Sequence, residues 1–170
     1  MSQLTNSSLL KLGSSCTSGI STKKRYRYAT IFVDHYSDLK YVHYMEDIKS
    51  RSTGYAKEFF KHYAAAHIIN IEHFHCDNGT FVDNNWIKHC EVKVQTITYC
   101  GVNAHFQNSI SEKAIQYIQT AARKILLHAK YRCTNANHLP LCPHTMRMAI
   151  HIHNNVPNIT DITSPLEAFA

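Results

Sequence analysis

Two acidic residues, Asp77 and Glu112, have sequence settings that suit the binding of a hard metal ion. Asp77 ends a strand-like run, and Glu112 lies in the first turn of a long helical pattern that begins near Ser109. They are 112 − 77 = 35 positions apart, so only a fold can bring the two carboxylates together. Carboxylates at a strand end and a helix start can hold Mg²⁺ or Mn²⁺, ions that promote transfer reactions at phosphorus. A metal site is therefore one interpretation of the pair.

Both residues also have a purely structural interpretation. Asp77 is followed by Asn78 and Gly79, and Asp-Asn-Gly is a common turn sequence. Ser109 and Glu112 fit a capping box, in which the glutamate bonds back to the residue that caps the helix. The two residues alone do not decide between a metal site and a turn followed by a capped helix.

The pattern of apolar and β-branched residues predicts alternating strands and helices in one α/β domain that spans residues 1–170. Residues 1–24 are rich in Ser and Thr, and they predict a weak or degenerate strand followed by a loop. Ser52 and Thr53 are expected to cap a helix that ends near Ala66. The other predicted elements are strands at 25–33, 39–45, 68–76 and 96–99, and helices at 81–90, 109–130 and 137–154.

The helix predicted from Ser109 to Lys130 has two different faces. Apolar residues recur every three or four positions and predict a core stripe: Ile110, Ala114, Ile118, Ala121, Ile125 and Ala129. A second arc is polar and ends in cations, with Glu112, Gln116, Gln119, Arg123 and Lys130. By itself this arc indicates a solvated face.

Four separated segments, in the same order, resemble the catalytic core of retroelement integrases, the D,D-35-E group, and most closely its copia-like retrotransposon branch. They are RYRYATIFVDHYSDLKYVHYM, HCDNGTF with Asp77, YCGVNAHFQNSISEK with Glu112, and NNVPNITDITSPLEAFA. The resemblance implies a ribonuclease H-like three-layer α/β fold, with a mixed central sheet and helices on both faces. It also implies transfer reactions on retroelement DNA ends, with Asp77 and Glu112 as catalytic ligands of Mg²⁺ or Mn²⁺, and a possible homodimer.

The resemblance also implies where DNA is contacted. In the family the helix that begins with the third acid lies along DNA, which implies phosphate contacts for Arg123 and, less strongly, for Lys130. We also expect Asn108, in the loop before this helix, to contact nucleic acid.

One acid of the family pattern is missing. Integrase cores have a first catalytic Asp on the opening strand, followed by Gln-Leu in copia-like members, and in MSQLTN this position is Ser2. Asp34 in VDHYS matches a different acid of the family, so we do not assign it the catalytic role. Ser109 stands where the family commonly has Gly. We therefore expect a truncated and impaired integrase core; the alternative is a non-catalytic remnant that binds nucleic acid or dimerises.

Composition agrees with an anionic partner inside the cell. The formal charge is 18 − 12 = +6, and thirteen histidines can add to it below neutral pH. There is no apolar run of about 18 residues and no signal-peptide pattern, so we expect no membrane partner. The six cysteines show no paired short spacing, and we expect them to be reduced in the nucleus or cytoplasm.

We expect neither the zinc-binding module that precedes integrase cores nor a basic tail after the core. The pairs His73-x-His75 and His151-x-His153 lack the matched partners of a structural zinc site. His75 is therefore expected to be buried or hydrogen-bonded within the fold.

Overall fold

The computed structural model of the chain describes residues 3–11, 26–76, 81, 83–100, 109–134, 141–157 and 162–170. The strands are β1 (Gln3–Lys11), β2 (Tyr28–Asp34), β3 (Lys40–Met45), β4 (Ile71–Cys76) and β5 (Thr96–Tyr99). The helices are α2 (Ser50–Ala66), α3 (Asn84–Val92), α4 (Ser109–Arg132), α5 (Cys142–Asn155) and α6 (Pro165–Phe169).

The strands form one mixed sheet in the order β3-β2-β1-β4-β5. β1, β2 and β3 pair antiparallel, whereas β4 pairs parallel with both β1 and β5. The weak strand predicted within residues 1–24 is thus confirmed, and it occupies the centre of the sheet. Parallel pairing places the carboxyl ends of β4 and β5 at the same edge of the sheet.

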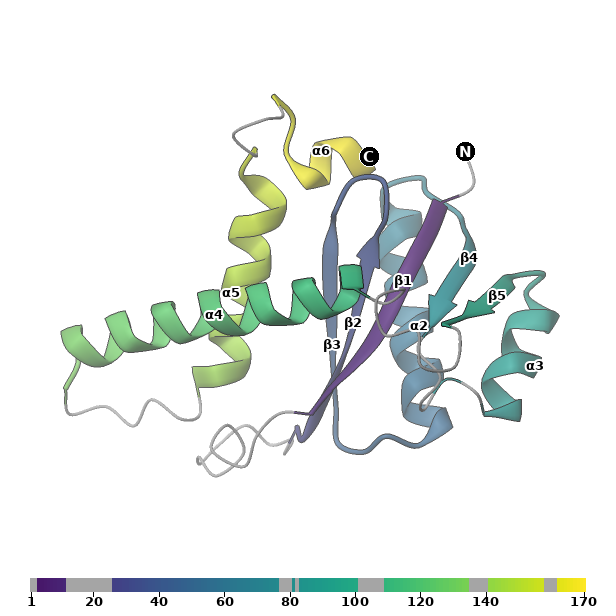
Figure 1. Cartoon of the computed structure of the whole chain (residues 1–170), viewed down its shortest axis with the longest axis horizontal. Helices are drawn as coiled ribbons and strands as arrows, with labels where there is room; N and C mark the ends of the chain where they lie inside the picture. Colours follow the sequence, from purple (N-terminus) through teal and green to yellow (C-terminus); the bar gives the residue numbers. More distant parts are fainter. Residues whose placement is uncertain are drawn as a thin grey trace.

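Helices cover both faces of the sheet, which confirms the predicted three-layer architecture (Figure 1). Phe32 and Phe74 face one side, where they pack with Phe60 of α2 and Trp86 of α3. Ile31 and Val33 alternate to the other side and pack against α4 and α5. The strands therefore separate two hydrophobic clusters: one includes residues of α2, α3 and α6, and the other includes residues of α4 and α5.

Two helices begin at other residues than predicted. α2 begins at Ser50 with Lys49 as its N-cap, and Thr53 lies inside the helix, where its hydroxyl donates to the Ser50 carbonyl at 3.0 Å. α3 begins at Asn84 instead of Phe81, because the Asp83 carboxylate caps it and accepts from the Asn85 amide at 2.7 Å.

The remaining differences concern β4, α5 and α6. β4 begins at Ile71 instead of 68, because Ile68 has a φ of +64° and is 96 % exposed. α5 begins at Cys142, and residues 137–140 of the predicted helix lie outside the described residues. The short helix α6 was not predicted, although Ser164 and Glu167 form a capping box at its start.

A buried lysine joins the two helices that cover one face. The Lys57 ammonium on α2 is fully buried and lies 2.9 Å from Cys90 Sγ on α3 and 3.0 Å from Gln95 Oε1. It also lies over the Trp86 and Phe74 rings, at 5.1 and 5.6 Å from their centroids. Burial lowers the pKa of Lys57 from its usual value of 10.5. The long side chain thus fills the space between α2, α3 and β4, and its charged end is hydrogen-bonded.

Packing should dominate the contribution of Lys57 to stability. We expect Lys57→Ala to lower the free energy of unfolding by about 2–5 kcal/mol, because it leaves a cavity in the core. Lys57→Met keeps the volume, removes a buried charge and leaves Gln95 Oε1 without its donor, so its cost should stay near 1–2 kcal/mol. Urea unfolding of both variants measures the difference. Equal losses would show that the charged hydrogen bonds, not the packing, provide the stabilisation.

Candidate active site

Asp77, one of the two predicted metal-binding acids, follows directly after β4 in the sequence. Cys76, the last residue of this strand, is fully buried, and its carbonyl accepts from the Cys100 amide at 3.1 Å. The ends of β4 and β5 are thereby tied together. Asp77 itself, like Ser2 and Asn108, lies outside the described residues.

Glu112 lies in the first turn of α4, and it is exposed. Its neighbours Ser111 and Ala114 face the sheet and are buried. Among the described residues, none donates a hydrogen bond to the Glu112 carboxylate, and no capping box joins it to Ser109. A carboxylate in this state can bind a hard cation.

The polar arc predicted on α4 is confirmed as a solvent-facing stripe. Glu112, Gln116, Gln119, Arg123 and Lys130 are all exposed. The last buried residue of the helix is Ala122, so the segment after it extends beyond the sheet, as Figure 1 shows. The positive residues of this segment are Arg123, Lys124, Lys130 and Arg132, and it contains no acid. Its charge suits a phosphate backbone.

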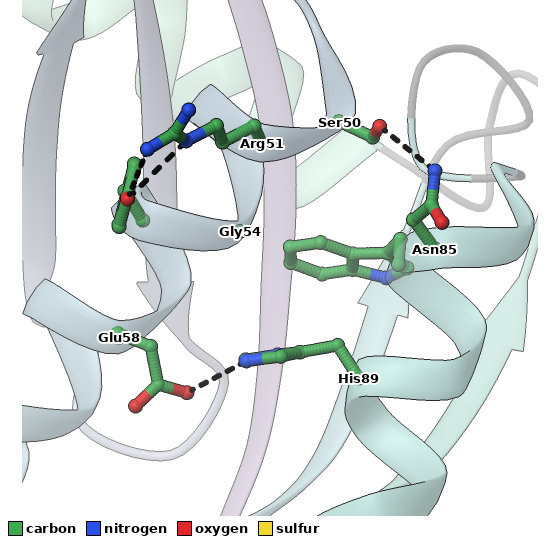
Figure 2. A pocket seen from close by; sticks show the side chains of 8 residues that line it. Ser50, Arg51, Gly54, Glu58, Asn85 and His89 are labelled. Carbon is green, nitrogen blue, oxygen red and sulfur yellow. Dashed lines mark hydrogen bonds and ion pairs between the residues drawn. The ribbon is translucent and has the colours of Figure 1, made fainter.

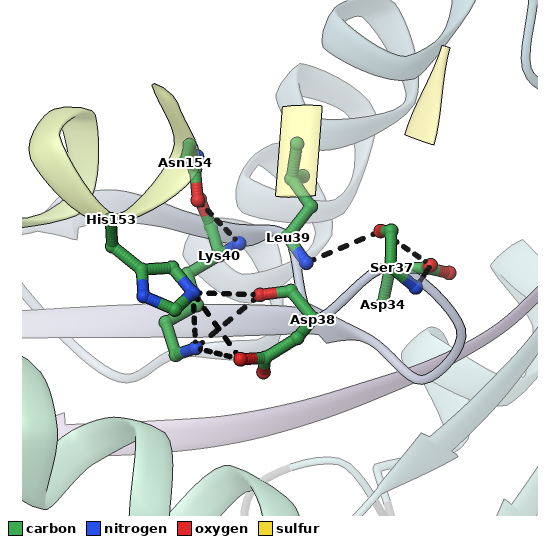
Figure 3. Close-up of polar contacts among 7 residues, drawn as sticks. All are labelled: Asp34, Ser37, Asp38, Leu39, Lys40, His153 and Asn154. Carbon is green, nitrogen blue, oxygen red and sulfur yellow. Dashed lines mark hydrogen bonds and ion pairs between the residues drawn. The ribbon is translucent and has the colours of Figure 1, made fainter. Parts of the chain in front are cut away.

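A polar cluster joins the β2–β3 hairpin to α5 (Figure 3), and α4 contacts it through Tyr117. Lys40 Nζ on β3 lies 2.8 Å from Asp38 Oδ2 and 2.6 Å from His153 Nε2 on α5. Tyr117 of α4 meets this cluster, with its ring 5.0 Å from the His153 ring and below the Lys40 ammonium. Asn154 bridges the backbone N–H and C=O of Lys40. These contacts hold α5 on the hairpin and α4 on α5.

Asp34 belongs to the same region. Its carboxylate is fully buried, and Oδ2 accepts from the amide and the hydroxyl of Ser37, both at 2.8 Å (Figure 3). It closes the turn between β2 and β3.

The positions on β1 define where a first acid could stand. In the pairing of β1 with β4, Gln3 is opposite Ile71 and Ser7 is opposite Cys76. Ile71 and Cys76 are five residues apart, which is about 16 Å along a strand. Gln3, next to Ser2, is therefore at the other end of β4 from Cys76, next to Asp77. The whole strand, QLTNSSLLK, contains no acid.

The histidines of β4 do not pair with each other. His73 bonds to Thr96 and Thr98 of β5, and His75 bonds to Thr98 and to the thiol of Cys100. The prediction that His75 is hydrogen-bonded within the fold is confirmed. No group of three His, Cys, Asp or Glu side chains within the described ranges could hold a metal ion.

A pocket of about 330 Å³ lies between α2 and α3 (Figure 2). His89 Nε2 lies 3.7 Å from Glu58 Oε1 across it. Burial, and then the charge of Lys57, lower the pKa of His89, so this contact joins a neutral ring to a carboxylate. Trp86 closes one side of the pocket. Because α2 and α3 cover the opposite face of the sheet from α4, the pocket is separate from Glu112.

Comparison with solved structures identifies the fold. No family model matches the chain, and no curated protein is significantly similar to it in sequence. The chain is similar to the HTLV-2 integrase catalytic core domain in complex with magnesium, at a TM-score of 0.67 and 15 % identity, covering 98 % of this chain and 95 % of that one. The chain has the fold of a retroviral integrase catalytic core.

Two further structures agree with this result. The catalytic core domain of BIV integrase has a TM-score of 0.66 and 14 % identity, with 99 % of this chain and 94 % of that one covered. A chain in the structure of the simian T-cell lymphotropic virus intasome in complex with the PP2A regulatory subunit B56 gamma has a TM-score of 0.71 and 13 % identity. That match covers 98 % of this chain but only 53 % of the other. None of the described helices is long and apolar enough to cross a membrane.

The charge on Asp38 should contribute to stability in a pH-dependent way. Burial alone would raise its pKa, but hydrogen bonds from His153 and Lys40 and the charge of Lys40 outweigh burial and lower the pKa below 3.8. Stability from a lowered carboxyl pKa is present above the unfolded value and is lost as pH falls through the folded value. Because half of the side chain is exposed, Asp38→Asn should cost only about 1–2 kcal/mol at pH 7.

Urea unfolding at a series of pH values tests this. The difference between wild type and Asp38→Asn should shrink below about pH 3.8. A difference that stays constant from neutral to acid pH would contradict a contribution from the charge.

Proposed function

We propose that this chain is the catalytic core of a retrotransposon integrase, of the copia-like D,D-35-E type, and that it is impaired as it stands. The observation that carries the proposal is the integrase-core fold, combined with an exposed Glu112 at the start of α4 and a strand, β4, that ends directly before Asp77. The substrate is DNA, and the place of action is the nucleus or cytoplasm.

In this proposal Asp77 and Glu112 hold the divalent ion. Glu112 fits this role, because its carboxylate is exposed and no described residue donates a hydrogen bond to it. Magnesium or manganese would supply charge stabilisation and an activated oxygen nucleophile for transfer at phosphorus. The cationic segment of α4, with Arg123 and Lys130, positions the DNA backbone, and Asn108 adds a contact from the loop before it.

The proposed impairment comes from the opening strand. The first acidic residue of the whole sequence is Asp34, and its buried carboxylate is bonded to Ser37. β1 therefore offers no carboxylate in any register. The sequence motif places the missing acid at the position of Ser2. By strand register, the β1 positions nearest to the end of β4 are Ser7, opposite Cys76, and Ser8 after it. A neutral hydroxyl is a poor ligand for Mg²⁺ beside carboxylates.

A second candidate function is a non-catalytic remnant that binds nucleic acid or dimerises. Exposed apolar residues favour self-association: Met148 and Ile152, one turn apart on α5, and Val156, the residue that follows the helix. Two of the similar structures are described as trimeric and dimeric forms of HTLV-2 integrase. A remnant of this kind would bind DNA but would gain no activity from repair of the opening strand.

DNA binding should be weak, independent of sequence and sensitive to salt. We expect dissociation constants of roughly 10⁻⁴–10⁻⁶ M at physiological salt. Arg123→Ala with Lys130→Ala should weaken binding to all sequences alike and reduce the slope of log K against log salt by about 2. Fluorescence anisotropy with duplexes of different sequence measures both.

The matched control removes two exposed cations from the opposite face of the sheet. Lys88→Ala with Lys93→Ala changes the net charge equally and should leave the slope nearly unchanged. An equal reduction in both double variants would show that overall charge, and not the α4 segment, binds DNA.

Repair of the first acid should restore activity. We expect metal-dependent nicking or joining of DNA in Ser8→Asp, or in Ser2→Asp within a chain extended at its amino end by a few strand-forming residues. The gain should be at least about 100-fold, because metal charge stabilisation is worth several kcal/mol. It should vanish when Asp77→Asn is added. Ser7→Asp is the control, because Ser7 pairs with Cys76 of the cluster under α2 and α3, whereas Ser8 pairs with Ile31 of the cluster under α4.

Strong activity in the unaltered chain would contradict the proposed impairment. A lack of activity in both repaired chains, with DNA binding intact, would favour the non-catalytic remnant.

A further inference from the structure

An amine and a thiol meet in the core beneath α2 and α3. Lys57 Nζ on α2 lies 2.9 Å from Cys90 Sγ on α3, and both side chains are fully buried. Hydrogen bonds to sulfur are generally longer than those to oxygen, because the sulfur atom is larger, so this is a close approach. Nitrogen and sulfur are therefore near enough for a single atom to bridge them.

The surroundings of Lys57 are neutral. In the described part of the chain, no carboxylate lies within ion-pair distance of its ammonium. Its other hydrogen bond goes to Gln95 Oε1 at 3.0 Å, and the Gln95 amide is fixed in this orientation because its Nε2 donates to the Ile71 carbonyl at 2.8 Å. The Trp86 and Phe74 rings also lie against the ammonium.

This setting favours a reactive amine. A buried ammonium has lost the water that stabilises its charge, and burial accordingly lowers the pKa of Lys57. The neutral amine that results has a lone pair, which can take up the thiol proton or form a new bond. Thiols beside a lysine are also among those that react most readily with peroxides.

A small oxidant can approach the pair from the pocket between α2 and α3 (Figure 2). The Trp86 ring lines this pocket, and its centroid lies 5.1 Å from Lys57 Nζ. Glu58 and His89, which follow Lys57 and precede Cys90 in the sequence, line it as well. One aromatic ring thus separates the pocket from the amine, and a small displacement of that ring admits a molecule the size of peroxide.

We propose that Lys57 and Cys90 are a modification site, at which hydrogen peroxide joins Nζ and Sγ through one oxygen atom. First, one peroxide molecule transfers an oxygen to the Cys90 thiol, which becomes a sulfenic acid, and leaves as water. A bond then forms between that oxygen and Lys57 Nζ, while the O–O bond of a second peroxide molecule breaks. The displaced N–H and O–H protons pass to this second peroxide, which becomes two molecules of water.

The balance is one thiol, one amine and two molecules of hydrogen peroxide for one N–O–S link and three molecules of water. The link joins α2 to α3 and closes a loop of the chain between positions 57 and 90, so it should stabilise the fold as a disulfide does. Excess dithiothreitol should reduce it back to the thiol, the amine and water. The proposal is independent of the proposed function, which uses neither residue.

The test treats the full chain, folded and without DNA, with hydrogen peroxide. Tryptic mapping should find peptide 52–61 joined to peptide 89–93, with one oxygen more and two hydrogens fewer than the two peptides together. Trypsin should not cut after Lys57, because a lysine without its charge does not fit the acidic pocket of the protease. Oxidation of the exposed Cys133 shows in the same sample that the peroxide has acted. The urea midpoint should rise, and dithiothreitol should reverse both changes.

Matched variants identify the two atoms that are joined. Lys57→Met nearly keeps the shape of the side chain and removes the amine, so Cys90 should stop at the sulfenic or sulfinic acid. Cys90→Ser should abolish the link. Lys61→Arg, one turn further along α2, removes a different amine and keeps the tryptic site, so the link should form at the wild-type yield.

The mass of the joined peptides identifies the bond in the wild-type chain itself, so the test stands even if a variant fails to fold. Peptides 52–61 and 89–93 that stay separate while Cys133 is oxidised would overturn the proposal. A joined pair that lacks the extra oxygen, and so contains a direct S–N bond, would also overturn it.

Discussion

The pairing of β1 with strands on both sides is the constraint on which the rest of this fold depends. Among the described strands, β1 alone joins the antiparallel hairpin of β2 and β3 to the parallel pair of β4 and β5. Thr5, for example, is opposite Asp34 on one side and Phe74 on the other. Because this register is fixed on two sides, it determines which positions of β1 accompany the carboxyl end of β4. Its sequence places serines and no acid there.

The two helical layers have different roles around this sheet. On one face, the buried Lys57 and the aromatic residues around it hold α2 and α3 together. On the other face, α4 is anchored through its first half and through Tyr117 to the cluster of Lys40, Asp38 and His153. Its exposed polar stripe is left facing solvent. The exposed stripe of α4, which suits a nucleic acid, is thus held in place by the packed first half of the same helix.

The repeating elements could be predicted from the sequence, because local patterns determine them. The three- and four-residue spacing of α4 identified its exposed stripe and most of its core stripe, but it missed the buried Ala122 and included Ala129, which lies outside the core cluster. The β-branched run before Asp34 identified β2. Helix starts were less predictable, since Ser52, Thr53 and Asp83 could all cap a helix and only Asp83 does so. The choice depends on which backbone amides the surrounding structure leaves unpaired.

Contacts between distant segments could not be predicted, because no local pattern encodes them. Lys40 and His153 are 113 positions apart, Lys57 and Cys90 are 33 apart, and His75 and Cys100 are 25 apart. The two-residue alternation of His73 and His75, and of Thr96, Thr98 and Cys100, did contain a signal, since both sets lie on strands. Only the pairing of β4 with β5 shows that they meet. The position of the missing first acid also depends on strand pairing. Motif order points to Ser2, whereas strand register points to Ser7 and Ser8.

The central claim is that Asp77 and Glu112 form one metal site at the carboxyl end of β4, without help from β1. The most direct measurement is anomalous diffraction from crystals of the chain grown with Mn²⁺. Our account predicts a manganese peak that is bonded to both carboxylates at about 2.0–2.3 Å, with water in place of a β1 ligand. A peak bonded to only one of the two acids, or no peak at Glu112 with the Asp77 carboxylate directed elsewhere, would contradict it.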